Sequence, residues 1–287
     1  MTADLLTPAS PTSPLVSSGA EAPSPDRAGQ RSRSGDHALR VLRWLSPVFV
    51  LGAWQLASTL GLLSAETLPS PRELWDTATY LWETQQLQEA LQVSIRRATL
   101  GFLIGAAIAV LLGTIVGLSR LGDALIDPLV QMLRVLPLFG LVPLFIIWFG
   151  IKEEPKIYLV ALFALVPLYL NLVAALQGVD RDLREVAASL RLTWWERLRH
   201  LYAPAVLPGF LVGLRQSLGS ALIALVVAEQ VNAGAGLGYL INNARDILRT
   251  DIIVVALLCY AILGLLTDAV VRSLERWAVR WRDEGVR

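Results

Sequence analysis

Long apolar runs separated by short polar stretches set the pattern of this chain. A helix needs roughly 20 consecutive apolar residues to cross a hydrocarbon core of about 30 Å. About six runs meet this requirement, and the sequence therefore predicts an all-α membrane protein with about six transmembrane helices. The runs cover residues 42–63, 100–118, 125–149, 157–176, 205–231 and 252–271.

The third run is expected to be kinked or broken. Pro128, Pro137 and Pro143 lie inside it, and each proline lacks the backbone N–H that an interior helical position donates. Broken helices at membrane depth are tolerated where they line a cavity or pack against protein. This run is therefore expected to border the path of a solute or a neighbouring helix.

The stretch before the second run, residues 66–91, is too polar to span a membrane and predicts an amphipathic helix at the interface. Within the second run, glycines form two pairs of small residues four positions apart. Such pairs let two helix backbones approach closely in lipid. They lie at Gly101, Gly105, Gly113 and Gly117.

The composition agrees with a membrane location and argues against several classes of function. Only 17% of the residues are charged, whereas soluble domains carry nearer 25%. The net charge of +1 gives no reason to expect a nucleic-acid partner. One cysteine and two histidines offer no metal-ligand cluster. The chain also lacks a phosphate-binding loop and the common hydrolase motifs, so no catalytic residue, metal or cofactor is expected.

Residues 1–38 are rich in Ser, Pro, Thr, Gly and Ala, and we expect a disordered cytoplasmic tail followed by a transmembrane permease domain at 39–287. Arginines concentrate in this tail, in the 180–200 stretch and in the C-terminal tail, which predicts that all three face the cytoplasm. The expected location is the cytoplasmic (inner) membrane, crossed several times, with lipid as a contact.

The stretch 180–208 is amphipathic and interrupted. Asp180 can cap its first turn, and Thr193 with Glu196 has the spacing of a capping box, so a second short helix is predicted to begin near Trp194. Apolar positions recur at helical spacing, with arginines and carboxylates on the other face. We expect a bent, two-part helix at a membrane face whose charged side meets a protein partner. An ordinary charged connection between two spans is the alternative.

Within this stretch, Glu185–Ala187 and Leu201–Pro204 resemble the EAA loop of ABC importer permeases. Arg191 stands where that loop has glycine, the residue that adopts positive φ freely. The Thr193 capping box is therefore expected to supply the bend.

Further segments, including WFGI, GLGY and RTD, resemble the permeases for aliphatic sulfonates, taurine and nitrate. The resemblance implies a type I ABC importer (methionine-importer-like) fold and a homodimer. It also implies a cytoplasmic ABC ATPase dimer that binds ATP and an extracytoplasmic solute-binding protein. The coupling helix would be 180–203. The residues implied in coupling are Glu185, Ala187, Arg191, Trp194, Arg197, Arg199 and Pro204.

Polar side chains inside apolar runs are the candidates for the translocation path. Each could instead fix helix packing through a hydrogen bond. Arg134 and Arg215 would either offset the charge of a crossing anion or snorkel to the cytoplasmic surface. Arg96 and Arg97, at the outer end of the second run, must snorkel or pair. The path candidates are Gln131, Arg134, Asn171, Gln216, Ser220 and Glu229.

We therefore expect a permease subunit that translocates a small solute, an aliphatic sulfonate, by alternating access driven by a separate ATPase. Nitrate, taurine or a heterocyclic vitamin precursor are alternative solutes. A stand-alone ion-coupled carrier, with Glu229 and Arg134 as relay groups, is the alternative from another class. A membrane enzyme is disfavoured because no nucleophile–base constellation occurs.

Overall fold

The computed structural model describes residues 49–50, 52–62, 64, 67–231 and 233–278. Contacts divide the chain into two units, Met1–Gly52 and Ala53–Arg287, and every helix discussed below belongs to the second. The expected tail of residues 1–38 and the start of the expected first span lie outside the described residues.

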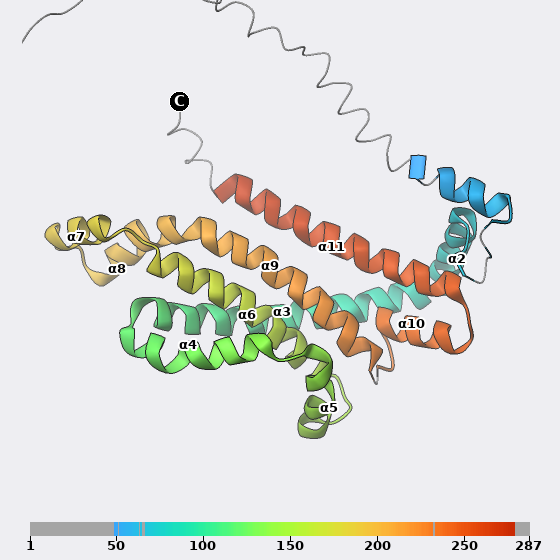
Figure 1. Cartoon of the computed structure of the whole chain (residues 1–287), viewed down its shortest axis with the longest axis horizontal. Helices are drawn as coiled ribbons and strands as arrows, with labels where there is room; N and C mark the ends of the chain where they lie inside the picture. Colours follow the sequence, from blue (N-terminus) through green and yellow to red (C-terminus); the bar gives the residue numbers. More distant parts are fainter. Residues whose placement is uncertain (1–48, 51, 63, 65–66, 232, 279–287) are drawn as a thin grey trace, which may run out of the picture. The chain divides into compact units, whose positions relative to one another are not determined.

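The described part of the chain is helical and contains no strand, which confirms the predicted fold class of an all-α protein (Figure 1). Short connections join most of the helices. The elements are α2 (Pro71–Glu83), α3 (Gln86–Leu118), α4 (Arg120–Val135), α5 (Leu138–Phe149), α6 (Glu154–Gln177), α7 (Arg181–Ser189), α8 (Trp194–Arg197), the π-helical turn η2 (Leu198–Tyr202), α9 (Ala203–Gln230), α10 (Leu237–Asp246) and α11 (Thr250–Ala278).

Four continuous helices of the described chain are long and apolar enough to cross a membrane, and a bent pair would make a fifth span. They match the expected second, fourth, fifth and sixth spans. The first expected span, 42–63, is described only in part. The four helices are Gln86–Leu118, Glu154–Gln177, Trp194–Gln230 and Thr250–Ala278.

The third expected span is broken, as its prolines predicted. The segments Arg120–Val135 and Phe139–Phe149 meet at 112°. Leu136, directly before Pro137, has the extended conformation φ −68°, ψ 132°. A proline ring clashes with a helical preceding residue, so the chain leaves α4 here and begins α5 in a new direction.

Helix α6 is the centre of the bundle, with α3 and α9 as its main neighbours (Figure 1). In its most apolar window, 61% of the residues are buried, the highest share among the four spans. A Cβ on Gly105 of α3 would collide with the carbonyl of Ala161, and one on Gly213 of α9 would lie 2.7 Å from Asn171 Cβ. The glycines of α3 therefore allow the close packing that their spacing predicted.

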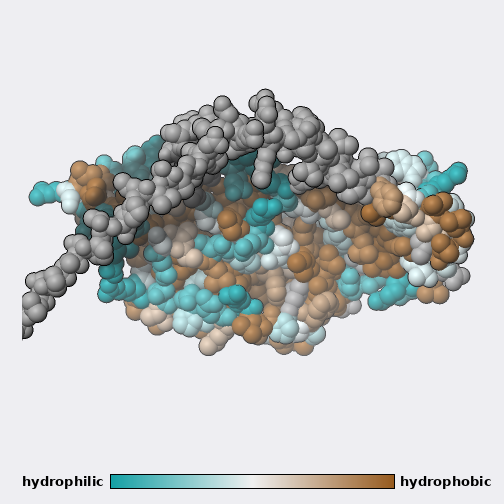
Figure 2. Space-filling view, turned by 45° about the horizontal axis from the view of Figure 1, so that its top comes forward, coloured by the Kyte–Doolittle hydropathy of each residue, from teal (hydrophilic) through white to brown (hydrophobic). Residues whose placement is uncertain are grey.

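The 66–91 stretch splits between two helices. Its first part forms the amphipathic helix α2, capped by a Ser70–Glu73 capping box and buried through Leu74, Thr77 and Leu81. Its second part continues directly into α3, so α3 begins at Gln86 instead of near residue 100. Apolar areas alternate with polar ones on the face shown in Figure 2, and exposed apolar side chains include Leu129 on α4. Such side chains suit lipid.

Candidate functional site

A pocket of about 430 Å³ opens between α4, α6 and α9. Four of the six predicted path residues line it: Arg134 from α4, Asn171 from α6, and Gln216 and Ser220 from α9. Gln131 is exposed on α4 and is not among the lining residues, and Glu229 lies elsewhere. The remaining lining is mostly apolar. It consists of Leu133, Leu162, Phe163, Val166, Pro167, Leu170 and Ala174.

The amides of the pocket are ordered by a pair of hydrogen bonds. Asn171 Nδ2 donates to Pro167 O at 2.8 Å and to Gln216 Oε1 at 3.0 Å. This engages the oxygen of Gln216 as an acceptor, while its Nε2 has no protein partner among the described residues. The same holds for the hydroxyl of Ser220. Two neutral donors therefore remain available to a solute.

The two arginines that the sequence left open differ in their surroundings. Arg215 Nε lies 2.6 Å from Asp268 Oδ1, and Asp268 also pairs with Arg272 at 2.7 Å. Arg134, in contrast, has no carboxylate partner among the described residues and lines the pocket. Within the described residues, the positive charge of Arg134 is therefore available to a solute in the pocket.

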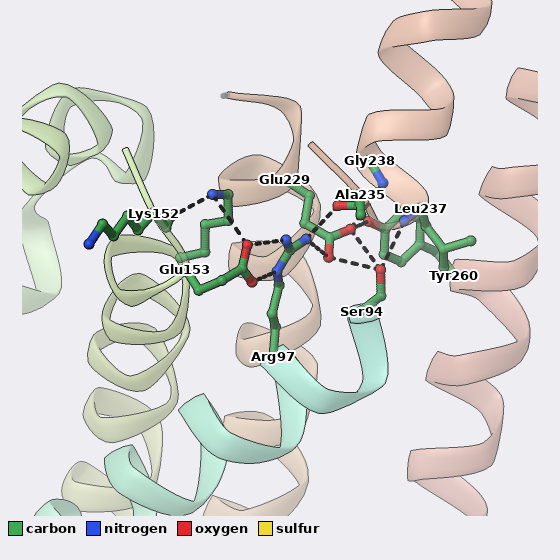
Figure 3. A network of polar contacts seen from close by, with 10 residues as sticks. Ser94, Arg97, Lys152, Glu153, Glu229, Ala235, Leu237, Gly238 and Tyr260 are labelled. Carbon is green, nitrogen blue, oxygen red and sulfur yellow. Dashed lines mark hydrogen bonds and ion pairs between the residues drawn. The ribbon is translucent and has the colours of Figure 1, made fainter. Parts of the chain in front are cut away.

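A buried polar network stands apart from the pocket and is centred on Glu229 (Figure 3). The carboxylate has 0% exposure. It accepts hydrogen bonds from Ser94 Oγ and Arg97 Nη1, both at 2.8 Å. It also accepts from Gly238 N at 3.0 Å and from Tyr260 OH at 2.8 Å. An ionised carboxylate in an apolar interior needs such partners, and both oxygens of Glu229 accept hydrogen bonds.

Arg97 connects Glu229 to the start of α6. The guanidinium, 2% exposed, donates to Glu153 from Nε and Nη2 at 2.6 Å each and to Ala235 O at 2.7 Å. The bonds from Arg97 hold the pKa of Glu153 below its ordinary value. Of the two outcomes expected for Arg97, the structure shows pairing, while Arg96 is exposed.

The network fixes the loop before α10 against three other helices. Gly236 has φ 110°, and a Cβ there would lie 2.6 Å from Glu229 Oε1. The amide of Leu237 donates to Ser94 Oγ at 2.9 Å. Helices α3, α9 and α11 therefore meet the N-terminus of α10 around one carboxylate. Sequence reasoning missed Ser94 and Tyr260, although Ser94 and Arg97 share a face at i, i+3 spacing.

The predicted bend of the 180–203 segment is present, and its cause differs in part from the expectation. Asp180 caps α7 by accepting from Asp182 N at 3.1 Å, and Thr193 forms the predicted capping box with Glu196. Arg191 itself adopts φ 50°. The amides of Arg191 and Leu192 donate to the carbonyls of Ala188 and Ala187, the pattern of a Schellman motif. An arginine thus occupies the usual glycine conformation.

Most coupling candidates of this segment lie on its surface. Glu185, Arg191 and Arg199 are exposed, and Ala187 is buried. Arg197 Nε donates to Leu192 O at 2.9 Å, which braces the turn, and Pro204 lies in the first turn of α9. Apolar side chains are also open to solvent. They are Leu183, Val186, Leu190, Trp194 and Trp195, each at least 50% exposed.

Comparison with known proteins places the chain in a class. Residues 98–280 match the family described as binding-protein-dependent transport system inner membrane component. The chain belongs to this family and is a multi-pass inner-membrane permease of the ABC importer type, not an enzyme.

Two relatives are named putative aliphatic sulfonates transport permease proteins. The one from Escherichia coli is 44% identical over 243 residues, covering 85% of this chain and 92% of the relative. The one from Bacillus subtilis is 41% identical over 239 residues, covering 83% and 87%. They confirm the resemblance to the sulfonate permease group. A solved structure of the MetNI methionine ABC transporter, inward facing, aligns at TM-score 0.48 and 20% identity, covering 66% of this chain and 94% of the other.

Proposed function

We propose that this permease translocates a small aliphatic sulfonate across the inner membrane by alternating access, driven by a separate ATPase. The two sulfonate permease relatives support the choice of solute. The pocket between α4, α6 and α9 supports the path, because it combines a cationic side chain with apolar walls. Taurine, nitrate and a heterocyclic vitamin precursor are the alternative solutes within the same family.

The exposed side chains of the 180–203 segment are the observation that supports docking of a separate ATPase. Trp194 and Trp195 are 64% and 65% exposed and lie beside each other, with ring centroids 6.3 Å apart. Glu185 and Arg199 are exposed on the same short segment. Exposed aromatic and arginine side chains gathered on a short segment are typical of protein docking surfaces. A cytoplasmic ABC ATPase dimer would cover this face and move α9 through the π-helical turn.

The arginine distribution supports an orientation with the 180–203 segment and both termini in the cytoplasm. The Glu229 network then lies at the outer end, where an extracytoplasmic binding protein would deliver the solute. A second copy of the chain would close the open side of the pocket. Large exposed apolar side chains on α4 and α5, such as Val135 and Phe139, suit such a homodimer contact.

The geometry around Glu229 disfavours an ion-coupled carrier. Glu229 is fully buried and its carboxylate is engaged by four donors, one of them the guanidinium of Arg97, so its contacts are those of a group that fixes helix packing. These contacts favour transport driven by a separate ATPase over an ion-coupled carrier that uses Glu229 as a relay group.

Reconstitution tests the proposal. The permease would be purified with its ATPase, incorporated into proteoliposomes with binding protein outside, and assayed for uptake of labelled ethanesulfonate. We expect uptake that requires ATP at the ATPase and is abolished by replacing the ATPase phosphate-binding lysine. A panel of taurine, nitrate and a heterocyclic vitamin precursor would be run in parallel. Uptake without the ATPase, driven by a proton gradient, would refute the ABC mechanism, and preference for another solute would refute the sulfonate assignment.

A further inference from the structure

The pocket between α4, α6 and α9 has two chemically different parts. Hydrogen-bond donors come from Arg134, Gln216 and Ser220, and aliphatic or aromatic side chains such as Leu162 and Phe163 supply the rest of the wall. We infer that this pocket is an anion-selective site within the permease itself, with Arg134 as the residue that determines charge selectivity. It takes a monoanionic oxyanion head group that carries a short apolar tail. The inference rests on the proposed function and deepens it.

Charge balance is the first argument. An anion that leaves water for a low-dielectric pore loses much solvation unless a fixed positive charge compensates it. Arg134 lines the pocket with no carboxylate partner among the described residues. A guanidinium also offers several donors in one plane, which matches the oxygens of a sulfonate. A passing anion would complete an ion pair that the protein leaves open.

The neighbouring arginine shows why Arg134 is the selective one. Arg215, on α9, is paired with Asp268 at 2.6 Å and does not line the pocket. Its charge is already compensated inside the protein. The two arginines therefore form a matched pair for experiment, one open to a solute and one engaged.

Neutral donors complete the head-group site. Asn171 donates to Gln216 Oε1 and to Pro167 O, so the Gln216 side chain is oriented while its N–H groups stay available. Ser220 adds a hydroxyl one helical turn further along α9. Together with Arg134 they provide several donors for an oxyanion. Such donors add orientation without changing the sign of charge that is preferred.

The lining also disfavours cationic groups. No carboxylate is among the residues that form this pocket in the described chain. A primary ammonium group would meet Arg134 and apolar walls and would find no negatively charged side chain to pair with. The pocket should therefore favour simple alkanesulfonates over zwitterionic aminosulfonates.

Cysteine modification tests the charge preference without transport. Cys259, the single cysteine of the chain, would be replaced by serine, and Ser220→Cys introduced as the reporter. The full transporter in membrane vesicles would be treated with two reagents of similar size. One is 2-sulfonatoethyl methanethiosulfonate, itself a short sulfonate, and the other is its trimethylammonioethyl counterpart.

The anionic reagent should react faster. Adding Arg134→Gln should lower the ratio of anionic to cationic rates by about tenfold, because one unit charge near the reporter is removed. Arg134→Lys should preserve the preference, and the matched control Arg215→Gln should change the ratio less than about twofold. Unreactive butanesulfonate should slow modification by the anionic reagent.

Equal rates for the two reagents, or a ratio that Arg134→Gln leaves unchanged, would overturn the inference. Absence of modification by either reagent would also overturn it, because the pocket would then be closed to solutes. The readout needs neither ATP nor binding protein. A failure of the proposed import function would thus leave this result intact, and a failure here would leave ATP-driven uptake unaffected.

Discussion

Replacing Arg97 with leucine should destabilise the protein more than a change at its exposed partner. Arg97 is 2% exposed and is the only cation that the structure places on the fully buried Glu229 carboxylate, within the described residues. Without it, Glu229 would keep three neutral donors but no counter-charge. Removing one member of a buried ion pair typically costs about 3–5 kcal/mol, because the other charge stays buried.

Glu153→Gln should cost far less. Glu153 is 54% exposed, so water already solvates much of its charge, and after its loss Arg97 still has Glu229 as a counter-charge. The single variant Glu229→Leu and the double variant Arg97→Leu, Glu229→Leu both leave the donors of Ser94, Gly238 and Tyr260 unmatched. The double variant, however, leaves neither member of the ion pair without its counter-charge. Its loss should therefore fall below the sum of the two single losses, with a coupling energy of about 1–3 kcal/mol.

Unfolding in mixed micelles provides the assay. The protein would be purified in a mild detergent, titrated with sodium dodecyl sulfate, and followed by the fluorescence of its nine tryptophans. The free energy of unfolding should fall in the order wild type, Glu153→Gln, Arg97→Leu. An Arg97→Leu variant no less stable than Glu153→Gln, or strictly additive losses in the double variant, would refute the argument that Arg97 and Glu229 compensate each other's charge in the interior.

Three further predictions concern local features. The pKa of Glu153 is lowered from 4.5 mainly by the hydrogen bonds from Arg97, so its stabilising contribution is present above pH 4.5 and is lost as pH falls through the lowered value; unfolding titrations of wild type and Glu153→Gln should converge on acidification, and parallel curves would contradict this. Arg191→Gly should stabilise the 180–203 segment by about 1 kcal/mol in thermal unfolding, because an L side chain is strained at its φ of 50°, and a loss would contradict the assigned conformation. Gly105→Ala should sharply reduce folded protein in size-exclusion chromatography, whereas Gly219→Ala, with open space around its Cβ position, should not; equal yields would contradict the close packing of α3 on α6.

Hydrophobic patterning predicted the spans well where length and composition decide the structure. The runs at 157–176, 205–231 and 252–271 correspond to α6, α9 and α11. The break in the third run followed from Pro137 and the residue before it. These features depend on local backbone chemistry, which a sequence displays directly.

Features that depend on distant partners were harder to predict. We expected an interfacial segment over residues 66–91 and a span from about residue 100, yet α3 runs without a break from Gln86. Its Ser94 and Arg97 bind Glu229, more than 130 residues later in the chain. Glu229 was a path candidate because it lies in an apolar run, but it is buried in this network and does not line the pocket. Such pairing cannot be read from spacing along the chain.

The candidate site itself was partly within reach of the sequence. Four polar residues inside apolar runs gather at one pocket, because α6 and α9 pack closely and α4 lies beside them. The sequence named Arg134 and not Arg215 as a path candidate but gave no physical reason for the choice, since the difference lies in the pairing of Arg215 with Asp268 on another helix. The conformation of Arg191 could not be predicted from its residue type. Hydrogen bonds from the amides of Arg191 and Leu192 to the carbonyls of Ala188 and Ala187 accompany a positive φ that arginine disfavours.

Coupling between hydrolysis and uptake tests the central claim most directly. Glu185→Lys combined with Arg199→Glu reverses two exposed charges of the 180–203 segment and leaves the Arg197 bond to Leu192 intact. Hydrolysis and uptake would be measured in the same proteoliposomes, with Arg245→Glu on α10 as a matched surface control.

The account predicts that the amount of solute transported per ATP hydrolysed falls by about tenfold, while the control retains the wild-type ratio and the variant remains inserted. An unchanged ratio in the charge-reversed variant would contradict a permease that is driven through this segment.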